Sequence, residues 1–386
     1  MRFDVVIVGG GLAGLSLACA LRDTRLKIAL VESRAPLPAE GWDSRVYAIS
    51  PASTEFLRTI GAWKHLDNAR LTPIEAMKIK GDGGARLAFS AYQAGVPELG
   101  WIVESSLMAC ELWESVKRQG NLTLCCPARP SALEFSASAA TLTLAGGQTL
   151  ESRLLVGADG RDSWVREAAG LSAIDTPYGE MGLVANFACE LPHRAIARQW
   201  FRDDGVLAWL PLPGKRISIV WSAPDALAAE LLALPAEALA ARVAAAGGDE
   251  LGALTQITAA SAFPLRLLRV PTTVARRLAL IGDAAHGIHP LSGHGINLGY
   301  QDARVLAELL AATPEWQDLG SERLLLRYQR ARREETLLMQ YTTDTLRRLF
   351  REKLPGLKTL RNIGMNLTNA LPVAKNLLVR YAIGAF

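Results

Sequence analysis

The sequence predicts an α/β fold, in which a doubly wound, mostly parallel sheet carries an inserted antiparallel sheet and ends in a helical C-terminus. Three observations predict it. The opening stretch FDVVIVGGGLAGLSLACALRD (residues 3–23) reads as a buried strand, a glycine turn and a helix. Apolar and polar residues alternate between about Tyr178 and Ser222, which is typical of antiparallel strands. Most of the chain after the strand RRLALIGDA (residues 276–284) has helical periodicity.

The first half of the chain alternates strands with helices. A strand over Asp4–Val8, a helix ending near Asp23 and a strand over Leu26–Val31 form a βαβ opening. Ser50 is a good N-cap, Pro51 is a good first helical residue, and the following Gly61 suits the end of that helix. Further elements follow in order: a helix over Ser105–Gln119, strands near Leu122, Ala132 and Leu142, and the strand RLLVGAD (residues 153–159).

A second sheet is indicated by the alternation in WFRDDGVLAWLPL (residues 200–212) and RISIVWS (residues 216–222). One helix rich in alanine and leucine is expected after it, to about Ala246. The pattern is irregular from 71 to 100, as if the chain leaves the first domain there. We expect a discontinuous first domain of residues 1–72, 97–175 and 276–355. A second domain of residues 73–96 and 176–275 is inserted into it, and residues 356–386 form an amphipathic helical tail.

Composition restricts the class of protein. The 386 residues have a net charge of +4, which is too small to indicate a nucleic acid partner. Residues 321–386 hold 13 Lys and Arg against 5 Asp and Glu, so this segment alone carries 13 − 5 = +8. No stretch reaches the roughly 18 apolar residues that a spanning helix needs. The odd number of cysteines, 5 without a C-x-x-C pair, favours a reducing compartment and no structural zinc. We therefore expect a cytoplasmic protein.

Gly9, Gly11 and Gly14 form G-x-G-x-x-G directly after the first strand and directly before the first helix. This arrangement presents free backbone N–H groups and the positive end of a helix dipole to a pyrophosphate. Glu32, 18 residues beyond Gly14, ends the second strand, where a carboxylate can accept hydrogen bonds from an adenosine ribose. Because a carboxylate opposes a 2′-phosphate, the pattern predicts FAD or NAD rather than NADP as the tightly bound dinucleotide.

Two later turns favour FAD over NAD. DGRDSWVR (residues 159–166) has the pattern D-G-x-x-S-x-x-R at a strand-to-helix turn, for which an ordinary capped turn is the alternative. Gly282 and Asp283 stand at another strand end, where a carboxylate can hold the ribityl hydroxyls of a flavin. The helix that starts near Gly293 can direct its N-terminus at the flavin ring and favour negative charge on the reduced ring.

These three motifs, in this order, resemble those of the flavoprotein aromatic hydroxylases typified by p-hydroxybenzoate hydroxylase. The chain is more narrowly similar to the ubiquinone-biosynthesis flavin hydroxylases. That resemblance rests on stretches spread over most of the chain: DSRVYAIS with the following GAW, FRDDGVLAWLPL, VWS, GDAAHGIHPLSGHGINLGYQDA and LKTLRNIGMNL.

The resemblance implies a Rossmann-like FAD-binding domain with an inserted substrate domain. The expected cofactor-binding residues are Gly9, Gly11, Gly14 and Glu32 at the ADP half, Arg45, Asp159 and Asp283 farther along the cofactor, and Pro290, Gly293, Gly295, Ile296 and Asn297 around the flavin ring. The reaction that the family implies is reduction by NAD(P)H, addition of O2 to give a flavin C4a-hydroperoxide, and transfer of one oxygen atom to a phenol ring. Such chemistry requires a pocket that excludes water.

Three histidines lie close together in the last of these motifs. His286, His289 and His294 invite a metal site, but Pro290 interrupts any continuous helix between them and would point them in different directions, so no metal is expected. Hydrogen-bonding roles that shape the loop are expected for His286 and His289. His294 stands where the family usually has Gln, and together with Pro290 it is the candidate for a catalytic contact. Ser106 is a second departure, because the family usually carries a basic, cofactor-contacting residue there.

We therefore expect a cytoplasmic FAD-dependent monooxygenase that hydroxylates the aromatic ring of a polyprenyl phenol in ubiquinone biosynthesis, with NAD(P)H and O2 as co-substrates. One alternative is a hydroxylase of a small soluble aromatic acid, whose carboxylate would need a buried cation such as Arg198, Arg202 or Arg216. Another is a non-catalytic flavin-binding subunit of a membrane-associated complex.

The C-terminal tail has alternatives of its own. Apolar residues recur in it at helical spacing, namely Leu357, Leu360, Ile363, Leu367 and Leu371. Such a helix can lie on the inner membrane as a peripheral anchor or dock with a partner of ubiquinone biosynthesis. It can also pack its apolar residues on the protein's own core.

Overall fold

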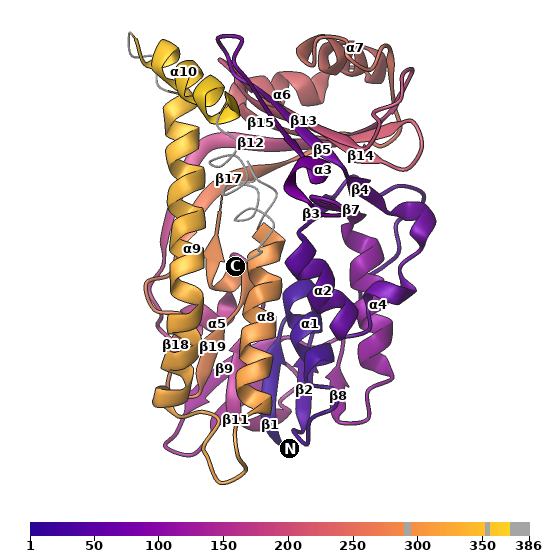
Figure 1. Cartoon of the computed structure of the whole chain (residues 1–386). Coiled ribbons are helices and arrows are strands. Elements are labelled where there is room, and N and C mark those ends of the chain that lie inside the picture. Colours follow the sequence, from indigo (N-terminus) through magenta and orange to yellow (C-terminus); the bar gives the residue numbers. More distant parts are fainter. Residues whose placement is uncertain (289–294, 352–355, 371–386) are drawn as a thin grey trace.

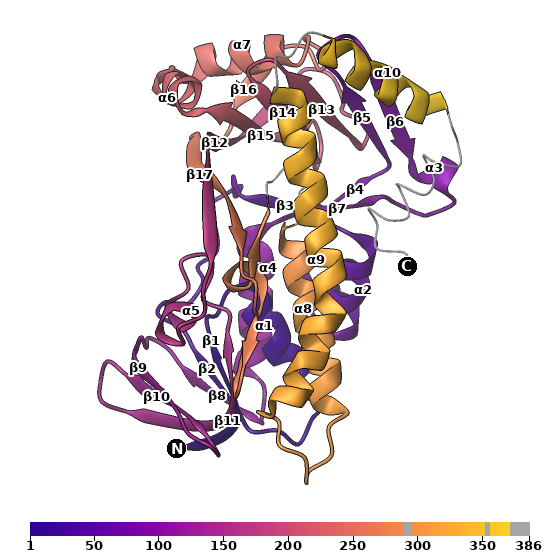
Figure 2. The same cartoon turned by 90° about the vertical axis from the view of Figure 1, so that its left-hand side faces the viewer.

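The computed structural model describes residues 1–288, 295–351 and 356–370. Two large sheets lie toward opposite ends of an elongated molecule, and the long helix α9 (Glu322–Arg351) runs beside both of them (Figures 1 and 2). The α/β fold class predicted from the sequence is confirmed.

The first sheet is built around β1 (Arg2–Val8), whose Val5, Val6 and Ile7 are completely buried. Across the sheet the strands lie in the order β18 (Val274–Ala275), β19 (Leu278–Leu280), β11 (Thr149–Gly157), β1, β2 (Ile28–Val31) and β8 (Leu122–Cys125), with β10 (Ala140–Leu144) on β11 and β9 (Pro130–Phe135) on β10. The strands from β19 to β8 run parallel. The predicted βαβ opening is therefore confirmed, and the carboxyl ends of β1, β2, β11 and β19 share one edge.

Helices cover both faces of this sheet. One face carries α1 (Leu12–Ala20), α2 (Pro51–Thr59), α4 (Ser105–Lys117) and α8 (Gly295–Ala311), which share a continuous apolar core with the strands. The short α5 (Trp164–Ala168) packs on the other face through Val165. Helix α2 begins as predicted, because the Ser50 hydroxyl accepts the N–H of Ser53 at 3.3 Å and Pro51 occupies the first turn.

A small antiparallel sheet lies between the two large ones, in the order β3 (Val46–Ile49), β7 (Gly100–Glu104) and β4 (Thr72–Ile74). Between α2 and β4 the chain forms two short 3-10 turns, η1 (Trp63–His65) and η2 (Asn68–Arg70). Figure 1 shows β3 and β7 where the two halves of the molecule meet.

The second large sheet is mostly antiparallel, as the alternation predicts. Its order is β20 (His286–Gly287), β17 (Ser261–Arg269), β12 (Ile174–Cys189), β15 (Arg216–Pro224), β14 (Gly205–Leu212), β13 (Ile196–Arg202), β5 (Ala76–Lys80) and β6 (Arg86–Ser90), with β16 (Leu254–Gln256) on β12. Strand β5 pairs parallel with β13, so the irregular stretch 71–100 supplies edge strands to this sheet, and α3 (Ala91–Ala94) follows them.

Two helices, not the single one expected, cover the outer face of the second sheet. Helix α6 (Asp225–Ala233) ends before Leu234, which is extended at ψ 142, and α7 (Ala236–Ala246) starts after Pro235. A residue that precedes proline is driven out of the helical region, which is why the periodicity continues through a point where the backbone cannot. Trp209 and Trp221 are buried in the core between this sheet and the two helices.

The C-terminal region is helical, as predicted. Helix α8 leads through a loop to α9, and α10 (Leu357–Ala370) lies across the edge of the second sheet (Figure 2). Leu360, Ile363 and Leu367 of α10 are exposed, so the alternative in which these residues pack on the protein's own core is wrong; Leu371 lies outside the described residues. Throughout the described ranges, no helix is both long enough and apolar enough to cross a membrane.

Candidate functional site

The turn between β1 and α1 is folded for close contact with a ligand's phosphates. Gly9 has φ +109, and a Cβ at Gly14 would lie 2.0 Å from the carbonyl oxygen of Gly9. By contrast, a Cβ at Gly11 would meet no atom within 4 Å. Gly11 is the N-cap of α1 and no side chain caps the helix, so no side chain occupies the N–H groups of the first turn. Such a helix start binds a pyrophosphate.

Glu32 follows β2 directly and closes one side of this turn. Its Oε2 accepts the N–H of Gly10 at 2.5 Å, and its Oε1 accepts the N–H of Arg34 at 3.0 Å and the hydroxyl of Ser33 at 2.8 Å. The carboxylate is therefore held beside the glycine turn at the end of β2. That is the position from which an acid reaches an adenosine ribose in dinucleotide-binding folds.

The turn after β19 lies against the same helix. Gly282 has φ +60 and starts the 3-10 turn η3 (Gly282–Ala284). A Cβ on Gly282 would lie 3.1 Å from Cβ of Ala13, and one on Gly299 of α8 would lie 3.3 Å from Cα of Gly282. Small residues thus let α1, η3 and α8 approach one another closely. Asp283 in this turn is exposed, so its carboxylate is free to meet a ligand that extends from α1.

A buried ionic network holds the η3 turn and α8 together, and the sequence reasoning missed two of its members. Asp302 of α8 accepts the N–H of Gly282 at 2.9 Å, contacts Nε2 of His286 at 2.6 Å and accepts Nε of Arg332 of α9 at 2.7 Å. The side chains of His286, Asp302 and Arg332 are at most 8% exposed. His286 therefore has the hydrogen-bonding role expected of it. Asp302 could have been suspected because it stands in the motif GDAAHGIHPLSGHGINLGYQDA, but nothing in the sequence indicates Arg332.

Charge controls the titration of this network. Burial would lower the pKa of His286, but the Asp302 carboxylate outweighs that effect and raises it. Burial would likewise raise the pKa of Asp302, but His286 and Arg332 lower it. The pair is therefore stabilised in its ionised form beside the η3 turn.

Asn297, in the first turn of α8, connects this helix to the β3–α2 connection. Its Oδ1 accepts the N–H of Ser50 at 2.9 Å and its Nδ2 donates to the carbonyl of Ala48 at 2.8 Å. Its side chain thus fixes where α8 begins. Gly295 starts the described part of the helix and Ile296 is half-buried, whereas Pro290, Gly293 and His294, along with His289, lie outside the described residues.

Arg45 is exposed just before β3, and its loop is joined to the start of α4 at Ser105 and Ser106. Asp43 accepts the N–H of Arg45 at 2.8 Å and that of Ser106 at 2.9 Å, while Ser105 donates its N–H to the Arg45 carbonyl at 2.9 Å. Asp43 therefore caps α4 from outside the helix. Among the described residues, no carboxylate lies at ion-pair distance from the Arg45 guanidinium, which leaves its charge available.

Asp159 occupies the turn after β11, where its side chain organises α5. Its two oxygens accept the Ser163 hydroxyl at 2.5 Å and the N–H of Val165 at 2.9 Å. Arg166 then donates to the carbonyl of Ala284 at 3.1 Å, which ties α5 to the η3 turn. The D-G element is thus a capped turn, and direct contact between Asp159 and a cofactor remains a prediction.

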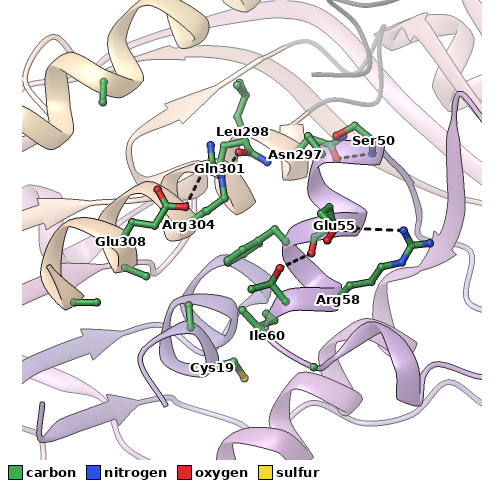
Figure 3. Close-up of a pocket in the computed structure, with 18 of the residues that line it drawn as sticks. Cys19, Ser50, Glu55, Arg58, Ile60, Asn297, Leu298, Gln301, Arg304 and Glu308 are labelled. Atoms are coloured by element: carbon green, nitrogen blue, oxygen red, sulfur yellow. Dashed lines mark hydrogen bonds and ion pairs between the residues drawn. The ribbon is translucent and has the colours of Figure 1, made fainter. Parts of the chain in front are cut away.

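A cavity of about 1130 Å³ lies on the α1, α2, α8 and α9 side of the first sheet (Figure 3). Two ion pairs lie in its lining: Arg304 is 2.9 Å from Glu308, and Arg58 is 3.6 Å from Glu55. Gly11, Glu32, Arg45 and Asp283 do not line it. Asn297, a predicted neighbour of the flavin ring, does line it, so the cavity reaches the first turn of α8 but not the turns that carry Glu32 and Asp283.

The face of the second sheet near Arg45 contacts the first half of the molecule through Asn186. Its Nδ2 donates to the carbonyl of Asp43 at 2.8 Å. Both Asn186 and Ser218, its neighbour across β12 and β15, are completely buried. The contact brings the second sheet to the loop that carries Arg45.

Comparison with known proteins agrees with this geometry. Residues 2–339 match the family model described as FAD binding domain. The chain is 38% identical over 384 residues to the ubiquinone hydroxylase UbiL of Rhodospirillum rubrum, a match that covers 99% of this chain and 89% of that protein. It is 32% identical over 385 residues to the 3-demethoxyubiquinol 3-hydroxylase of Escherichia coli, covering 99% and 98% of the two chains.

A solved structure also has the same fold. The structure of Pseudomonas aeruginosa PqsL in complex with 2-aminobenzoylacetate superimposes with a TM-score of 0.80 at 23% identity, covering 95% of this chain and 99% of that one. The likeness extends over both large sheets because nearly the whole of each chain is included.

Proposed function

The chain belongs to the FAD binding domain family, and we propose that it is a monooxygenase that uses FAD to hydroxylate the aromatic ring of a polyprenyl phenol in ubiquinone biosynthesis. The two relatives described above are hydroxylases of ubiquinone intermediates by name, and the chain matches both over 99% of its length. FAD is the cofactor and NAD(P)H and O2 are the co-substrates of this proposal.

The observation that carries the proposal is the uncapped start of α1. No side chain occupies the N–H groups of its first turn, Glu32 lies beside the glycine turn, and Asp283 is exposed on a turn that packs on Ala13. An uncapped helix start offers donors to a pyrophosphate, and two separated carboxylates offer acceptors to ribose and ribityl hydroxyls. The donors and acceptors present thus fit FAD.

When bound, FAD supplies the redox chemistry, in which two electrons from NAD(P)H reduce O2 so that one oxygen atom enters the ring and the other leaves as water. In our proposal the chain's own residues bind and orient. Glu32 holds the adenosine ribose, Asp283 holds the ribityl portion, and Arg45 presents a cation close to α4 and the second sheet. Asn297 positions the start of α8, whose N-terminus favours negative charge on a reduced ring. Pro290, Gly293 and His294 complete the predicted surroundings of the ring.

The structure gives a reason to prefer a polyprenyl phenol over a small aromatic acid. A buried substrate carboxylate needs a cation that is not already neutralised. Arg198 lies 2.9 Å from Glu250 and Arg202 lies 2.8 Å from Asp204. Arg216 donates to the Pro213 carbonyl at 3.0 Å and lies over the ring of Trp42. The three candidate cations therefore have partners within the protein, and two of them are paired with acids.

The substrate class also bears on location. A polyprenyl chain partitions into a bilayer, so an enzyme that acts on its phenol head must reach the membrane surface or receive the substrate from a partner. We propose a cytoplasmic protein that associates peripherally with the inner membrane, either directly or within a ubiquinone-biosynthesis complex.

The test is turnover of a prenylated phenol. The purified holoprotein is supplied with NAD(P)H, isotopically labelled O2 and either a prenylated phenol or hydroxybenzoate, and product mass is measured. We expect label in the prenylated product and none in hydroxybenzoate. Labelled hydroxybenzoate alone would establish the small-acid alternative, and bound FAD with neither NAD(P)H oxidation nor labelled product from either substrate would favour the non-catalytic subunit. The mass of the quinone precursor that accumulates when the gene is deleted identifies the ring position.

A further inference from the structure

Helix α10 is bound to the protein by its polar face. The side-chain oxygens of Asn362, Asn366 and Asn369 accept backbone N–H groups of the β5–β6 turn and of β6. The donors are Gly83 at 3.1 Å, Ala85 at 3.3 Å, Arg86 at 3.2 Å and Ala88 at 3.2 Å. Strand β6 is the edge of the second sheet, and its outward N–H groups would otherwise be left without a partner strand. The asparagine row therefore covers this edge.

A charged contact reinforces the attachment. The side chains of Asp82 and Arg361 are 3% and 4% exposed and form an ion pair, and Asn362 Nδ2 also donates to Asp82 at 2.9 Å. Arg361 further donates to the carbonyl of Leu349 near the end of α9, at 2.7 Å. Helix α10 is thus fixed both to the sheet edge and to the preceding helix.

The opposite face of α10 is apolar and turned to solvent. Leu360 is 66% exposed, Ile363 56% and Leu367 58%. Their spacing places them on one stripe, which we call the outer stripe. A surface helix ordinarily buries its apolar face and exposes its polar one. In α10 the arrangement is inverted, because the polar face contacts the protein and the apolar face is exposed. The hydrogen bonds of Asn362, Asn366 and Asn369 to the sheet edge hold the helix in this orientation.

We propose that the outer stripe inserts into the interfacial layer of an anionic lipid bilayer, so that α10 lies in the membrane plane and holds the edge of the second sheet against it. The inference rests on the proposed function, because a polyprenyl phenol resides in the bilayer. The outer stripe is then the surface that makes the membrane contact.

Charge favours lipid over other occupants. Residues 353–386 contain 5 Lys and Arg, namely Lys353, Lys358, Arg361, Lys375 and Arg380, and no Asp or Glu. Lys358 is 51% exposed and lies 3.9 Å from both Asp82 and Asp203. An exposed apolar stripe in a segment with net positive charge has the composition of an interfacial helix that binds acidic headgroups. A surface for a second copy of this chain would instead bring like charges together.

The experiment is flotation of the full-length holoprotein with lipid vesicles. Vesicles of phosphatidylcholine with phosphatidylglycerol, and of phosphatidylcholine alone, are compared for the wild type and for L360Q/I363Q/L367Q, which preserves helix propensity. Trp316→Gln is the matched control, because Trp316 is 84% exposed in the loop between α8 and α9, at the end of the molecule away from α10 (Figure 1). FAD content and thermal unfolding verify that each variant is folded.

We expect the wild type and Trp316→Gln to float with the anionic vesicles, and the triple variant to bind about a hundredfold more weakly, because three apolar side chains lose their burial. Equal flotation of the triple variant would overturn the proposal. A wild type that does not float would also overturn it. In that case, a change from dimer to monomer in the triple variant would indicate that a second copy covers the outer stripe. A lower unfolding temperature of the triple variant would indicate that a segment of the chain itself covers it.

Turnover measured in the same preparations separates the two proposals. With a short-chain prenylated phenol in detergent, the triple variant should hydroxylate as fast as the wild type, and it should fall behind only when the substrate is embedded in vesicles. If no preparation hydroxylates but the flotation results hold, the proposed function fails and the lipid contact stands.

Discussion

At the residue scale, Gly11 and Gly14 share one motif but meet different surroundings. We predict that Gly14→Ala destabilises the apoprotein by about 3 kcal/mol, because its methyl group would overlap the Gly9 carbonyl within a packed turn. Gly11→Ala should leave apoprotein stability unchanged and weaken FAD binding at least about tenfold, because its methyl group enters the space through which a pyrophosphate approaches. Urea unfolding of the apoproteins and FAD titration measure the two effects.

The two variants are controls for each other. If Gly11→Ala bound FAD as well as the wild type does, the pyrophosphate would not approach α1 at this glycine. If Gly14→Ala were as stable as the wild type, the close contact between Gly14 and Gly9 would not be a feature of the folded protein.

His286 makes stability depend on pH. Its folded-state pKa is raised by Asp302, so the stabilisation is complete below the unfolded histidine pKa of about 6.5 and is lost as pH rises through the higher folded value. Arg332 and Asp283 are the other charged groups that act on it. The free energy of unfolding should therefore fall above pH of about 6.5, by up to about 1.4 kcal/mol per pH unit. Urea unfolding across this range measures the slope.

His286→Gln removes the titrating group and should flatten this decline. His65→Gln, which changes an exposed histidine in η1, should keep the wild-type slope. An unchanged slope in His286→Gln would assign the pH dependence to another group. Asp302 acts in the opposite direction: its pKa is lowered, so its contribution is present above the unfolded carboxyl pKa and is lost on the acid side.

At the element scale, we predict that α10 detaches locally when its buried ion pair is broken. Asp82→Asn removes the carboxylate charge that the buried Arg361 guanidinium meets, and losing one charge of a buried pair is costly. Amide hydrogen exchange in α10 should then accelerate about a hundredfold, while β1 and α1 remain protected. Mass spectrometry of the exchanged peptides measures both regions.

Asp203→Asn is the matched control for that experiment. Asp203 lies 3.9 Å from Lys358, but its side chain is 72% exposed, so its loss should change little. Equal acceleration in both variants would mean that net charge, and not the buried pair, holds the helix.

Elements with a strong local pattern were predictable, and those decided by distant contacts were not. The β1–α1 turn and the start of α2 follow from Gly, Ser and Pro at defined positions. The break between α6 and α7 was missed because the alanine- and leucine-rich periodicity continues across Pro235. The orientation of α10 was missed because periodicity reveals an apolar stripe but not which face of the helix packs on the protein. That choice depends on Asn362, Asn366 and Asn369, which accept N–H groups from an edge strand and its turn some 280 residues earlier.

At the scale of the whole molecule, the sequence indicated the nucleotide-binding turns but not how they are held together. Glycine motifs and acids at strand ends predict where the dinucleotide lies, because the carboxyl ends of parallel strands meet at one edge. The network of His286, Asp302 and Arg332 could not be predicted, because it depends on how α9 packs against α8. The predicted contacts of Pro290, Gly293 and His294 remain predictions.

Helix α9 is the element that links the two large sheets. Near its start, Arg332 binds Asp302 beside the η3 turn. Near its end, Arg347 donates to Glu180 of β12 at 2.9 and 3.1 Å. Between these points Gln340 donates to the carbonyl of Leu268 of β17 at 2.9 Å. The contacts of Arg332 and Gln340 are buried and that of Arg347 is partly buried, so the sheets should unfold as one cooperative unit.

We therefore predict that FAD protects both sheets, although its proposed contacts lie on the first. A ligand that binds only the folded state stabilises it by about 2.7 kcal/mol at a concentration 100 times its Kd. If folding is one unit, slow hydrogen exchange in β12 and β15 should decrease by the same factor as in β1 and β11 when FAD is added to the apoprotein. Protection confined to the first sheet would show that the second sheet unfolds independently. Glu180→Gln, which removes the charge that Arg347 meets, should reduce the protection that reaches β12 while leaving β1 as in the wild type.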